Sequence, residues 1–440
     1  MVEMMDLPNG WTWVSLADIA LINPKLPFED IPDDLDVSFL PMKLVEEVSN
    51  VIHLTETRKY KDVKKGFVPM TDGDVIFAKI TPCMENGKVA VVHSLANRIA
   101  FGSTEFHVFR CHDSVANHFL FFYLVQAQFR QNAQHNMTGA VGQRRVPKKY
   151  LEEHQLPLPP LAEQGRIVAK IEELFSSLDK GVENLQTAQA QLKTYRQAVL
   201  KWAFEGRLTN ENVKDGELPA GWKWVKIHEA AESLDSHRRP INKEERVKRK
   251  GEIPYYGANG RTGWIDDYLF NEPLVLVVED ETFIGRKEPF SYKITGKSWV
   301  NNHAHILRPK GIIDLDYLNY QLMFYPFLQF TTGTTGRQKL TKNALMNAPI
   351  KICHLEEQAR IVSEIEARLS VCDQLEESIA QSLVTAEALR QSILKKAFEG
   401  KLVPQDPADE PASALLARIR AQREKTPQDK LRATKGKKQS

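Results

Sequence analysis

The sequence predicts two mixed α/β globular domains, related by an approximate twofold repeat and separated by an intramolecular antiparallel coiled coil of two long helices. Three observations lead to this fold class. A short opening motif occurs twice, a helical ending occurs twice, and the residues between them differ. At 440 residues the chain is also too long for one ordinary hydrophobic core.

The repeat has matching ends and divergent middles. The opening motif is "LPNGWTWV" at residues 7–14 and "LPAGWKWV" at 218–225, with six of eight letters identical. The helical ending contains "EQGRIV" (163–168) and "EQARIV" (357–362), followed by "RQAVLKWAFEGRL" (196–208) and "RQSILKKAFEGKL" (390–402). The offset falls from 211 residues at the opening motif to 194 at the ending, so the second globular stretch is shorter.

The globular stretches combine predicted strands with predicted helices. The segments "DGDVIFAKI" (72–80) and "NGKVAVV" (86–92) are typical of buried strands, and "PLVLVVED" (273–280) is the matching strand of the second half. Residues 117–134 and 315–331 occupy equivalent places and predict amphipathic helices. Each helix leads into a TG segment, "TGAVGQRRVPK" (138–148) or "TGTTGRQKLTK" (332–342).

The repeated endings predict the coiled coil, because apolar residues recur at seven-residue steps. We expect this seam to comprise Ile171, Leu178, Leu185, Leu192 and Val199 in the first helix and Ile365, Cys372, Ile379, Ala386 and Ile393 in the second. The residues three positions later, such as Leu174, Tyr195, Trp202, Leu375 and Leu389, are expected between them. Gly206 and Gly400 are expected to end the helices. If the second helix pairs with the first, it must run back along it.

Composition bounds the class of protein. The sequence is 42% hydrophobic with a formal net charge of +2, which is typical of a soluble globular protein without a strong overall charge. Four scattered cysteines and the absence of a secretory signal or a long apolar run predict a cytoplasmic protein.

We expect neither a catalytic residue nor a metal site in the sequence. The segment "TGKS" (295–298) lacks the first glycine of a phosphate-binding loop, and no Asn-Pro-Pro-aromatic motif of an amino-methyltransferase is present. His303 and His305 could share one face of a strand, but two histidines without further clustered ligands are more often structural.

Basic residues on loops are the remaining functional signal. Positive side chains beside Gly, Thr and Asn suit contacts with phosphates and base edges of nucleic acid. The candidate DNA-binding residues are Lys79, Thr81, Lys88, Arg144, Arg145, Lys148, Arg261, Arg286, Lys287, Arg337, Lys339 and Lys342.

With these motifs in hand, the chain resembles a specificity subunit of a type I restriction-modification system. The doubled "GW-x-W-V", the segments "PLPPLAEQGRIV" and "LEEQARIV", the twin "AFEG" helix ends and "IPYYGANGRTGWIDDYLF" carry the resemblance, from Leu7 to about Leu402. The resemblance implies two target-recognition domains, at 1–156 and 209–350, conserved helical spacers at 157–208 and 351–402, and a basic, partly disordered tail at 403–440.

The resemblance also implies a function. Such a subunit binds double-stranded DNA, reads one half of a split asymmetric site with each recognition domain, and has no catalytic residue. Its partners are two methyltransferase subunits and the restriction/translocase subunits, with no membrane involved. No cofactor is expected on this chain, because S-adenosylmethionine, ATP and Mg are expected on partner subunits only.

Two alternatives remain open at this stage. A coiled-coil scaffold that binds proteins through its globular ends would explain the helices and the lack of catalytic motifs, but not the paired basic loops. A fused DNA methyltransferase or nuclease with one degenerate half would need a cofactor loop and a catalytic motif. Salt-dependent DNA binding separates the favoured function from the scaffold.

Overall fold

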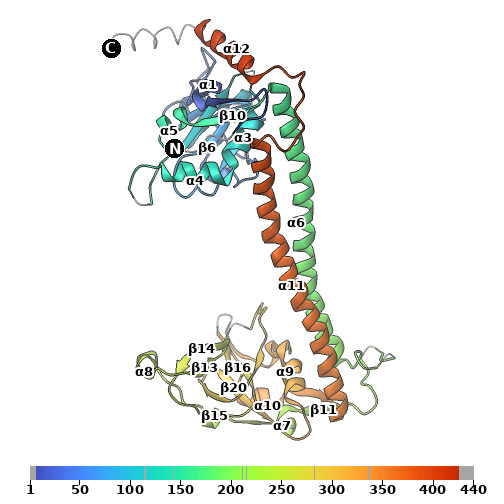
Figure 1. Ribbon diagram of the computed structural model, residues 1–440. Helices are drawn as coiled ribbons and strands as arrows, with labels where there is room; N and C mark the ends of the chain where they lie inside the picture. Colours follow the sequence, from blue (N-terminus) through green and yellow to red (C-terminus); the bar gives the residue numbers. More distant parts are fainter. Residues whose placement is uncertain are drawn as a thin grey trace. The chain divides into compact units, whose positions relative to one another are not determined.

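A computed structural model describes residues 6–112, 115–140, 142–210, 212–214, 216–281, 283–334 and 337–425. The chain divides into two compact units (Figure 1). Unit 1 comprises residues 1–183 and 382–440, and unit 2 comprises residues 184–381. Each unit holds one globular domain and parts of both long helices, and unit 2 is inserted in the sequence between the two stretches of unit 1.

The domain of unit 1 is built from two four-stranded sheets. The first has the order β2 (Ala20–Ile22), β9 (Phe106–Cys111), β6 (Val75–Ala78), β7 (Val89–Val91), and the second β4 (Thr57–Lys59), β3 (Asp36–Leu40), β8 (Ile99–Gly102), β5 (Val68–Thr71). A further pair joins β1 (Thr12–Ser15) to β10 (Gln155–Leu158). The helical segments are α1 (Leu16–Ile19), η1 (Met42–Leu44), α2 (Tyr60–Val63), η2 (Ala96–Arg98), α3 (Asn117–Val125), α4 (Ala127–His135) and α5 (Lys148–Glu153).

Unit 2 repeats this topology on a different sequence. Its sheets have the orders β12 (Ala231–Ser233), β20 (Ala304–Pro309), β16 (Leu274–Val278), β18 (Ser291–Ile294) and β14 (Gly260–Ile265), β13 (Ile253–Gly257), β19 (Lys297–Val300), β15 (Phe270–Asn271). The smaller sheets are β11 (Lys223–Lys226) with β23 (Pro349–Ile352), and β17 (Asp280–Glu281), β22 (Arg337–Lys339), β21 (Thr332–Thr334). The helical segments are α7 (Ile227–Ala230), η3 (Asp235–His237), α8 (Lys243–Lys248), α9 (Leu315–Met323), η4 (Phe327–Phe330) and α10 (Lys342–Asn347).

The central strand of each domain is buried on both faces. In β6, Val75 and Phe77 belong to one hydrophobic cluster, whereas Ile76 belongs to another. The strand β16 divides in the same way, with Val275 and Leu276 in different clusters. Because successive strand side chains point to opposite faces, a continuous apolar run is what such a strand requires. These two strands lie within the segments 72–80 and 273–280 that the sequence predicts.

The repeated opening motif joins each domain to the start of a long helix. The helices are α6 (Leu161–Phe204) and α11 (Leu355–Phe398). The indole Nε1–H of Trp11 donates to Oε2 of Glu163, and that of Trp222 donates to Oε1 of Glu357, each at 3.1 Å. The next residue of each helix, a buried glutamine, accepts a backbone N–H from the turn before α3 or α9. The matched sequence ends thus make the same joint in each unit.

The proline of each opening motif also packs against the glycine that follows a long helix. Gly400, after α11, has a φ of +67°, and a Cβ there would lie 2.3 Å from Cγ of Pro8. Gly206, after α6, has a φ of +80°, and its Cβ would lie 2.2 Å from Cγ of Pro219. Two reasons favour glycine at each of these positions: the backbone has a positive φ, and a Cβ would clash with the neighbouring proline.

The two long helices contact each other and run in opposite directions within each unit. In unit 1, Ile171 of α6 shares a core cluster with Ile393 near the end of α11. In unit 2, Val199 near the end of α6 shares a cluster with Ile365 near the start of α11. The predicted fold class, two mixed α/β domains and two antiparallel long helices, is confirmed.

The seven-residue seam is observed, but the residues that pack beside it differ from the prediction. The seven-residue line of α11 is buried at all five positions, and that of α6 is buried at Ile171 and Val199 and half-buried between them. The residues expected between them three positions later are exposed toward the helix end, with Tyr195 at 44% and Trp202 at 51%. In α6 the line four positions later is buried at Phe175 and Ala203 and half-buried at the positions between them. A heptad repeat accommodates either spacing, and the partner's position selects one.

Two other expectations need correction, and the tail contains an element that the sequence analysis did not name. The helix expected at 117–134 is two helices that meet at Gln126, and α3 is buried along most of its length. The helix expected at 315–331 ends at Met323, before Pro326, because proline cannot continue a helix. The expected tail contains a helix, α12 (Ala412–Lys425), whose residues Leu415 and Ile419 are buried in the core of unit 1. Residues 426–440 lie outside the described part.

Candidate nucleic-acid interface

In unit 1 the TG segment folds back on itself and pairs with the chain that leaves β6. Thr138 and Arg145 exchange two backbone hydrogen bonds, of 3.0 and 2.8 Å. The N–H of Thr81 donates to the carbonyl of Arg144 at 3.1 Å, and that of Val146 donates to the carbonyl of Lys79 at 2.9 Å. Four predicted site residues, Lys79, Thr81, Arg144 and Arg145, are thereby brought together at one end of the central strand.

Unit 2 builds the equivalent place with a more regular hairpin. Strands β21 and β22 form the TG segment, and β22 pairs with β17, which follows the central strand β16. The N–H of Leu340 donates to the carbonyl of Glu279 at 2.8 Å, the counterpart of the Val146–Lys79 bond. Lys339 is held on β22. The backbone of Arg337 lies on the same strand, whereas its side chain is outside the described part.

Two of the predicted cations, Arg145 and Lys339, are paired with carboxylates from another segment of the chain. Arg145 donates through Nε and Nη2 to both oxygens of Glu105, at 2.9 and 2.8 Å. This hydrogen bond lowers the pKa of Glu105 despite the partial burial of its carboxyl group, so the pair is charged at neutral pH. The Nζ of Lys339 lies 3.0 Å from Oε1 of Glu279. These pairs orient the side chains, and a phosphate would compete with the carboxylates for them.

The other predicted cations bond to a loop of their own domain, pair within a helix, or are exposed without a carboxylate partner. Lys88 donates to the carbonyl of Val45 at 2.7 Å, so its ammonium group anchors a loop of its own domain. Lys148 pairs with Glu152 on α5 at 3.0 Å. Among the described residues, Arg144, Arg261, Lys287 and Lys342 are exposed and have no ion-pair partner.

An exposed aromatic side chain lies beside the cations of unit 2. The guanidinium of Arg261 lies 4.4 Å from the ring centroid of Trp264 on strand β14, and Trp264 is 49% exposed. Arg286 Nη2 donates to Oδ1 of Asn259 at 2.7 Å, which links the β13–β14 turn to the loop after β17. Sequence reasoning did not select Trp264. The signal was its place between glycines and basic residues in "GRTGWIDDYLF".

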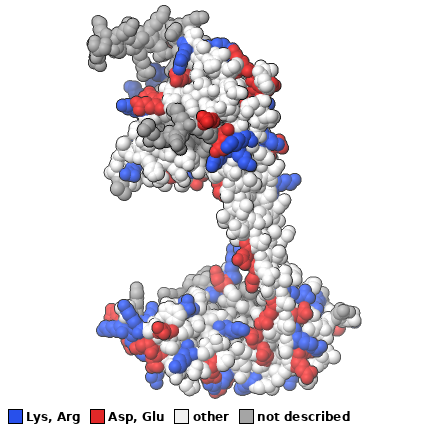
Figure 2. Space-filling view, in the orientation of Figure 1, with Lys and Arg blue, Asp and Glu red and all other residues white. Residues whose placement is uncertain are grey.

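The charge on the visible face is mixed. Figure 2 shows Lys and Arg interspersed with Asp and Glu over the globular parts of both units, in keeping with the net charge of +2. The candidate nucleic-acid interface is therefore sought in local groups of cations.

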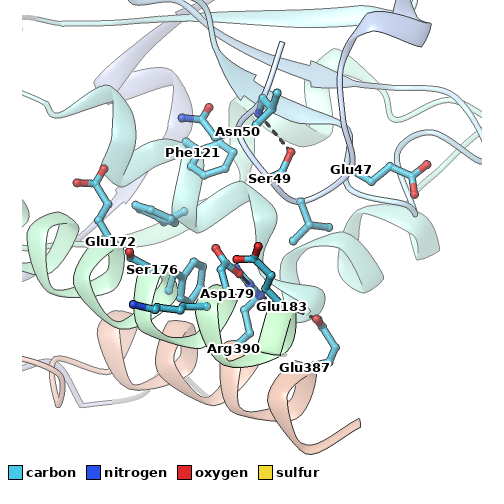
Figure 3. Close-up of a pocket in the computed structure, with 15 residues that line it drawn as sticks. Glu47, Ser49, Asn50, Phe121, Glu172, Ser176, Asp179, Glu183, Glu387 and Arg390 are labelled. Atoms are coloured by element: carbon cyan, nitrogen blue, oxygen red, sulfur yellow. Dashed lines mark hydrogen bonds and ion pairs between the residues drawn. The ribbon is translucent and has the colours of Figure 1, made fainter. Parts of the chain in front are cut away.

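A large hollow in unit 1 is lined mainly by acidic side chains, which do not suit a phosphate backbone. Its volume is about 1020 Å³, and it lies between the loop around Ser49, α3 and the two long helices (Figure 3). Five carboxylates line it, against two cations: Glu47, Glu172, Asp179, Glu183 and Glu387 against Lys180 and Arg390. Arg390 is paired with Asp179. This acidic surface repels DNA, so we place no DNA contact there.

The described residues contain no group of three or more His, Cys, Asp or Glu side chains that could hold a metal ion. His303 lies before β20 and pairs with Asp280 at 2.8 Å, whereas His305 lies within the strand and is buried. The two histidines therefore face different surroundings. No helix in the described part combines the length and apolarity that a membrane crossing needs.

Comparison with known proteins matches this architecture. The family model for the type I restriction modification DNA specificity domain matches residues 8–192 and again residues 219–384. The chain therefore belongs to the type I restriction-modification specificity family, as the sequence motifs predict, and the two matched stretches are its two repeats.

Curated relatives are specificity subunits. The chain is 38% identical over 225 residues to the EcoAI specificity subunit of Escherichia coli, covering 51% of this chain and 37% of that protein. It is 24% identical to the Escherichia coli EcoEI specificity subunit, covering 88% and 83%. The match to EcoAI thus spans about a third of that protein's length. Membership of this family makes the chain a recognition component and not a catalytic subunit.

Solved structures share the fold. A chain from a study of complex assembly and conformational transition in the type I R-M system has a TM-score of 0.70 at 22% identity, covering 91% of this chain and 100% of that one. The HsdS subunit of Thermoanaerobacter tengcongensis has a TM-score of 0.63 at 22% identity, covering 91% and 99%.

Proposed function

We propose that this chain binds double-stranded DNA and reads a bipartite, asymmetric site, one half-site with each globular domain. The observation that carries the proposal is the repeat itself: two domains of one topology present different side chains at equivalent TG segments. In unit 1 the segment carries Arg144 and Arg145, and in unit 2 it carries Lys339, while strand β14 of another sheet carries the Arg261–Trp264 pair. Different side chains on one scaffold suit two different half-sites.

The matched segments have a separate role in the proposal. The long helices set the gap between the half-sites, and the repeated surfaces dock two methyltransferase subunits, which restriction/translocase subunits join. Each helix has 44 residues, or roughly 66 Å at 1.5 Å per residue, comparable with about two turns of B-DNA. Recognition domains at 1–156 and 209–350, spacers at 157–208 and 351–402 and a cytoplasmic location complete the proposal.

The proposal places the chemistry on the partners. The methyltransferase subunits would hold S-adenosylmethionine and must extrude an adenine from the duplex to reach its amino group. ATP and Mg would be held by the restriction/translocase subunits. The present chain would grip the duplex on either side and leave the target base free.

The test is to express the chain with a methyltransferase subunit encoded beside it and to map N6-methyladenine across the host genome. We expect one motif of two short fixed blocks around a constant unread gap. A continuous motif, or methylation that does not depend on this chain, would overturn the proposal. Binding of the complex to the mapped site should weaken steeply as salt rises, because phosphate contacts release counterions. Salt-independent binding would favour a protein scaffold.

A further inference from the structure

Each domain contains one buried histidine that ties its TG segment to the central sheet. His107 lies on β9 and is 4% exposed, and His305 lies at the equivalent place on β20 and is 1% exposed. Their Nε2 atoms lie 2.9 Å from the carbonyl of Val146 and 2.7 Å from the carbonyl of Leu340. Val146 and Leu340 are the residues that end the paired part of the two TG segments.

The two histidines differ in the group that faces Nδ1. In unit 1 this group is the side-chain amide of Asn23, whose Nδ2 lies 3.2 Å away. Oδ1 of Asn23 accepts the N–H of Val108 at 2.9 Å, which fixes the amide orientation and points its NH₂ group at His107. In unit 2 the group is the carboxylate of Asp235, with Oδ2 2.5 Å from Nδ1 of His305. Oδ1 of Asp235 accepts the N–H of Ile306 at 2.9 Å.

These contacts dictate different numbers of protons on the two rings. His107 donates through Nε2–H to a carbonyl and accepts at Nδ1 from an amide, which is the pattern of a neutral imidazole. His305 has an acceptor at each nitrogen, a carbonyl and a carboxylate. A neutral imidazole carries one N–H and would leave two lone pairs facing each other at about 2.5–2.7 Å. Only the imidazolium satisfies both contacts.

The surrounding charges agree with this assignment. Around His305 lie Asp235 and Glu279, with Nδ1 3.9 Å from Oε2 of Glu279, and behind them Arg238 and Lys339. Independently of His305, Asp235 accepts the N–H of Ile306, and Nη2 of Arg238 lies 3.5 Å from its Oδ2, and both contacts favour the ionised carboxylate. Asp235 is thus ionised and cannot supply the shared proton.

Around His107 the balance is reversed. Burial lowers its pKa, and the charges of Lys79 and Lys148 act in the same direction against the hydrogen bond to Val146 and the charge of Glu105. A protonated His107 would also place an N–H against the NH₂ group of Asn23.

We propose that His107 and His305 are positioning residues for the two TG segments, and that His107 acts as a neutral imidazole while His305 acts as an imidazolium. The assignment of the segments to DNA contact rests on the proposed function, whereas the proton count and the anchoring do not. The two recognition domains would then hold the same loop by a neutral contact in one copy and by a charged network in the other.

The proton count is tested by nitrogen NMR of the full-length chain labelled at the histidine rings, at about pH 7.5, where an ordinary histidine is mostly neutral. His107→Gln and His305→Gln chains assign the two signals. We expect two protonated nitrogens for His305 and one for His107. Asp235→Asn recreates the amide of unit 1 and should convert His305 to the singly protonated pattern. A singly protonated His305 in the unmodified chain overturns the charge assignment.

The anchoring is tested by hydrogen–deuterium exchange. His305→Ala should raise amide exchange at residues 338–341 and leave residues 143–146 unchanged, whereas Asp235→Asn, which keeps the Nε2–H donor, should leave both unchanged. If His305→Ala does not fold, His107→Ala supplies the same test with the segments exchanged. Unchanged exchange in a folded alanine variant overturns the anchoring. Raised exchange with unaltered DNA binding of the methyltransferase complex would keep the anchoring and refute DNA contact by the segment.

Discussion

The indole N–H of Trp11 donates to the buried carboxylate of Glu163, which is 152 residues further along the chain, at 3.1 Å. The second copy of both motifs makes the same bond between Trp222 and Glu357. The repeated motifs "GW-x-W-V" and "EQ" therefore have a structural role. In each unit the tryptophan of the first motif hydrogen-bonds to the glutamate of the second, in the first turn of a long helix. The shared segments build joints, and the segments that differ lie at the candidate interface.

The Trp11–Glu163 joint predicts a pH-dependent gain from removing a charge. Burial raises the pKa of Glu163 more than the hydrogen bond from Trp11 lowers it. A carboxyl whose pKa is higher in the folded state favours folding at low pH, and this advantage is lost as pH rises through the raised pKa. Glu163→Gln keeps an acceptor for Trp11, so it should raise the melting temperature relative to the unmodified chain at pH 7, and the difference should vanish near about pH 4.

Trp11→Phe is the matched variant for this joint. It leaves the carboxylate without its indole donor and should cost about 1–3 kcal/mol of unfolding free energy at neutral pH. Thermal unfolding of all three chains at both pH values checks the pair of predictions. A lower melting temperature for Glu163→Gln at pH 7 would contradict the burial argument.

The helix ends predict opposite effects for two glycine substitutions. Gly400→Ala places a Cβ 2.3 Å from Pro8 at a φ of +67°, and we expect a loss of at least about 1–3 kcal/mol. Gly181→Ala lies within α6 with nothing near its Cβ and should stabilise the chain by up to about 1 kcal/mol. Denaturation of the two variants gives both numbers, and equal effects would mean that the Gly400–Pro8 contact does not form.

The spacing of the helical seam predicts which truncation is costly. Phe175 is buried against Phe122, with ring centroids 5.8 Å apart, and under the guanidinium of Arg390 at 4.4 Å. Phe175→Ala should cost about 3–5 kcal/mol. Tyr195→Ala removes an exposed ring on the line three positions from the seam and should stay within about 0.5 kcal/mol. The reverse order in chemical denaturation would restore the spacing that the sequence suggested.

Arg144 predicts the electrostatic part of DNA binding. It is exposed, has no ion-pair partner in the described residues and follows the turn of the TG segment. Arg144→Ala in the methyltransferase complex should weaken DNA binding and reduce the slope of log K against log salt by about one. Lys170→Ala, which removes a cation paired with Glu173 on α6, is the control and should leave the slope unchanged. An equal change in both variants would place the DNA elsewhere.

The length of the two long helices predicts the number of unread base pairs between the half-sites. Adding one heptad to α6 after Leu185 and one to α11 after Ile379 keeps both seams in register and lengthens each helix by about 10 Å. Methylation mapping should show a gap longer by roughly three base pairs, at about 3.4 Å each, with both half-sites unchanged. Altered half-sites would show that the helices take part in reading bases.

Some features could be predicted from the sequence because they depend on local periodicity and repetition. Continuous segments of the sequence contain three such features: the heptads of α6 and α11, the strands β6 and β16, and the basic TG segments. The helix break at Gln126 and the packing of α12 were not predicted, because both depend on what covers the segment. The line between the seam residues was predicted on the wrong side, since a seven-residue repeat does not say where the partner helix lies.

The candidate site divides in the same way. The sequence by itself determined that two copies of one scaffold carry different basic loops, because repeats and charges are visible letter by letter. Only the tertiary structure decided which cations are engaged, as with Lys88 on the carbonyl of Val45, and which are free to meet a phosphate. It alone set Asn23 against His107 and Asp235 against His305, since the proton count of a buried ring depends on partners that sequence distance conceals.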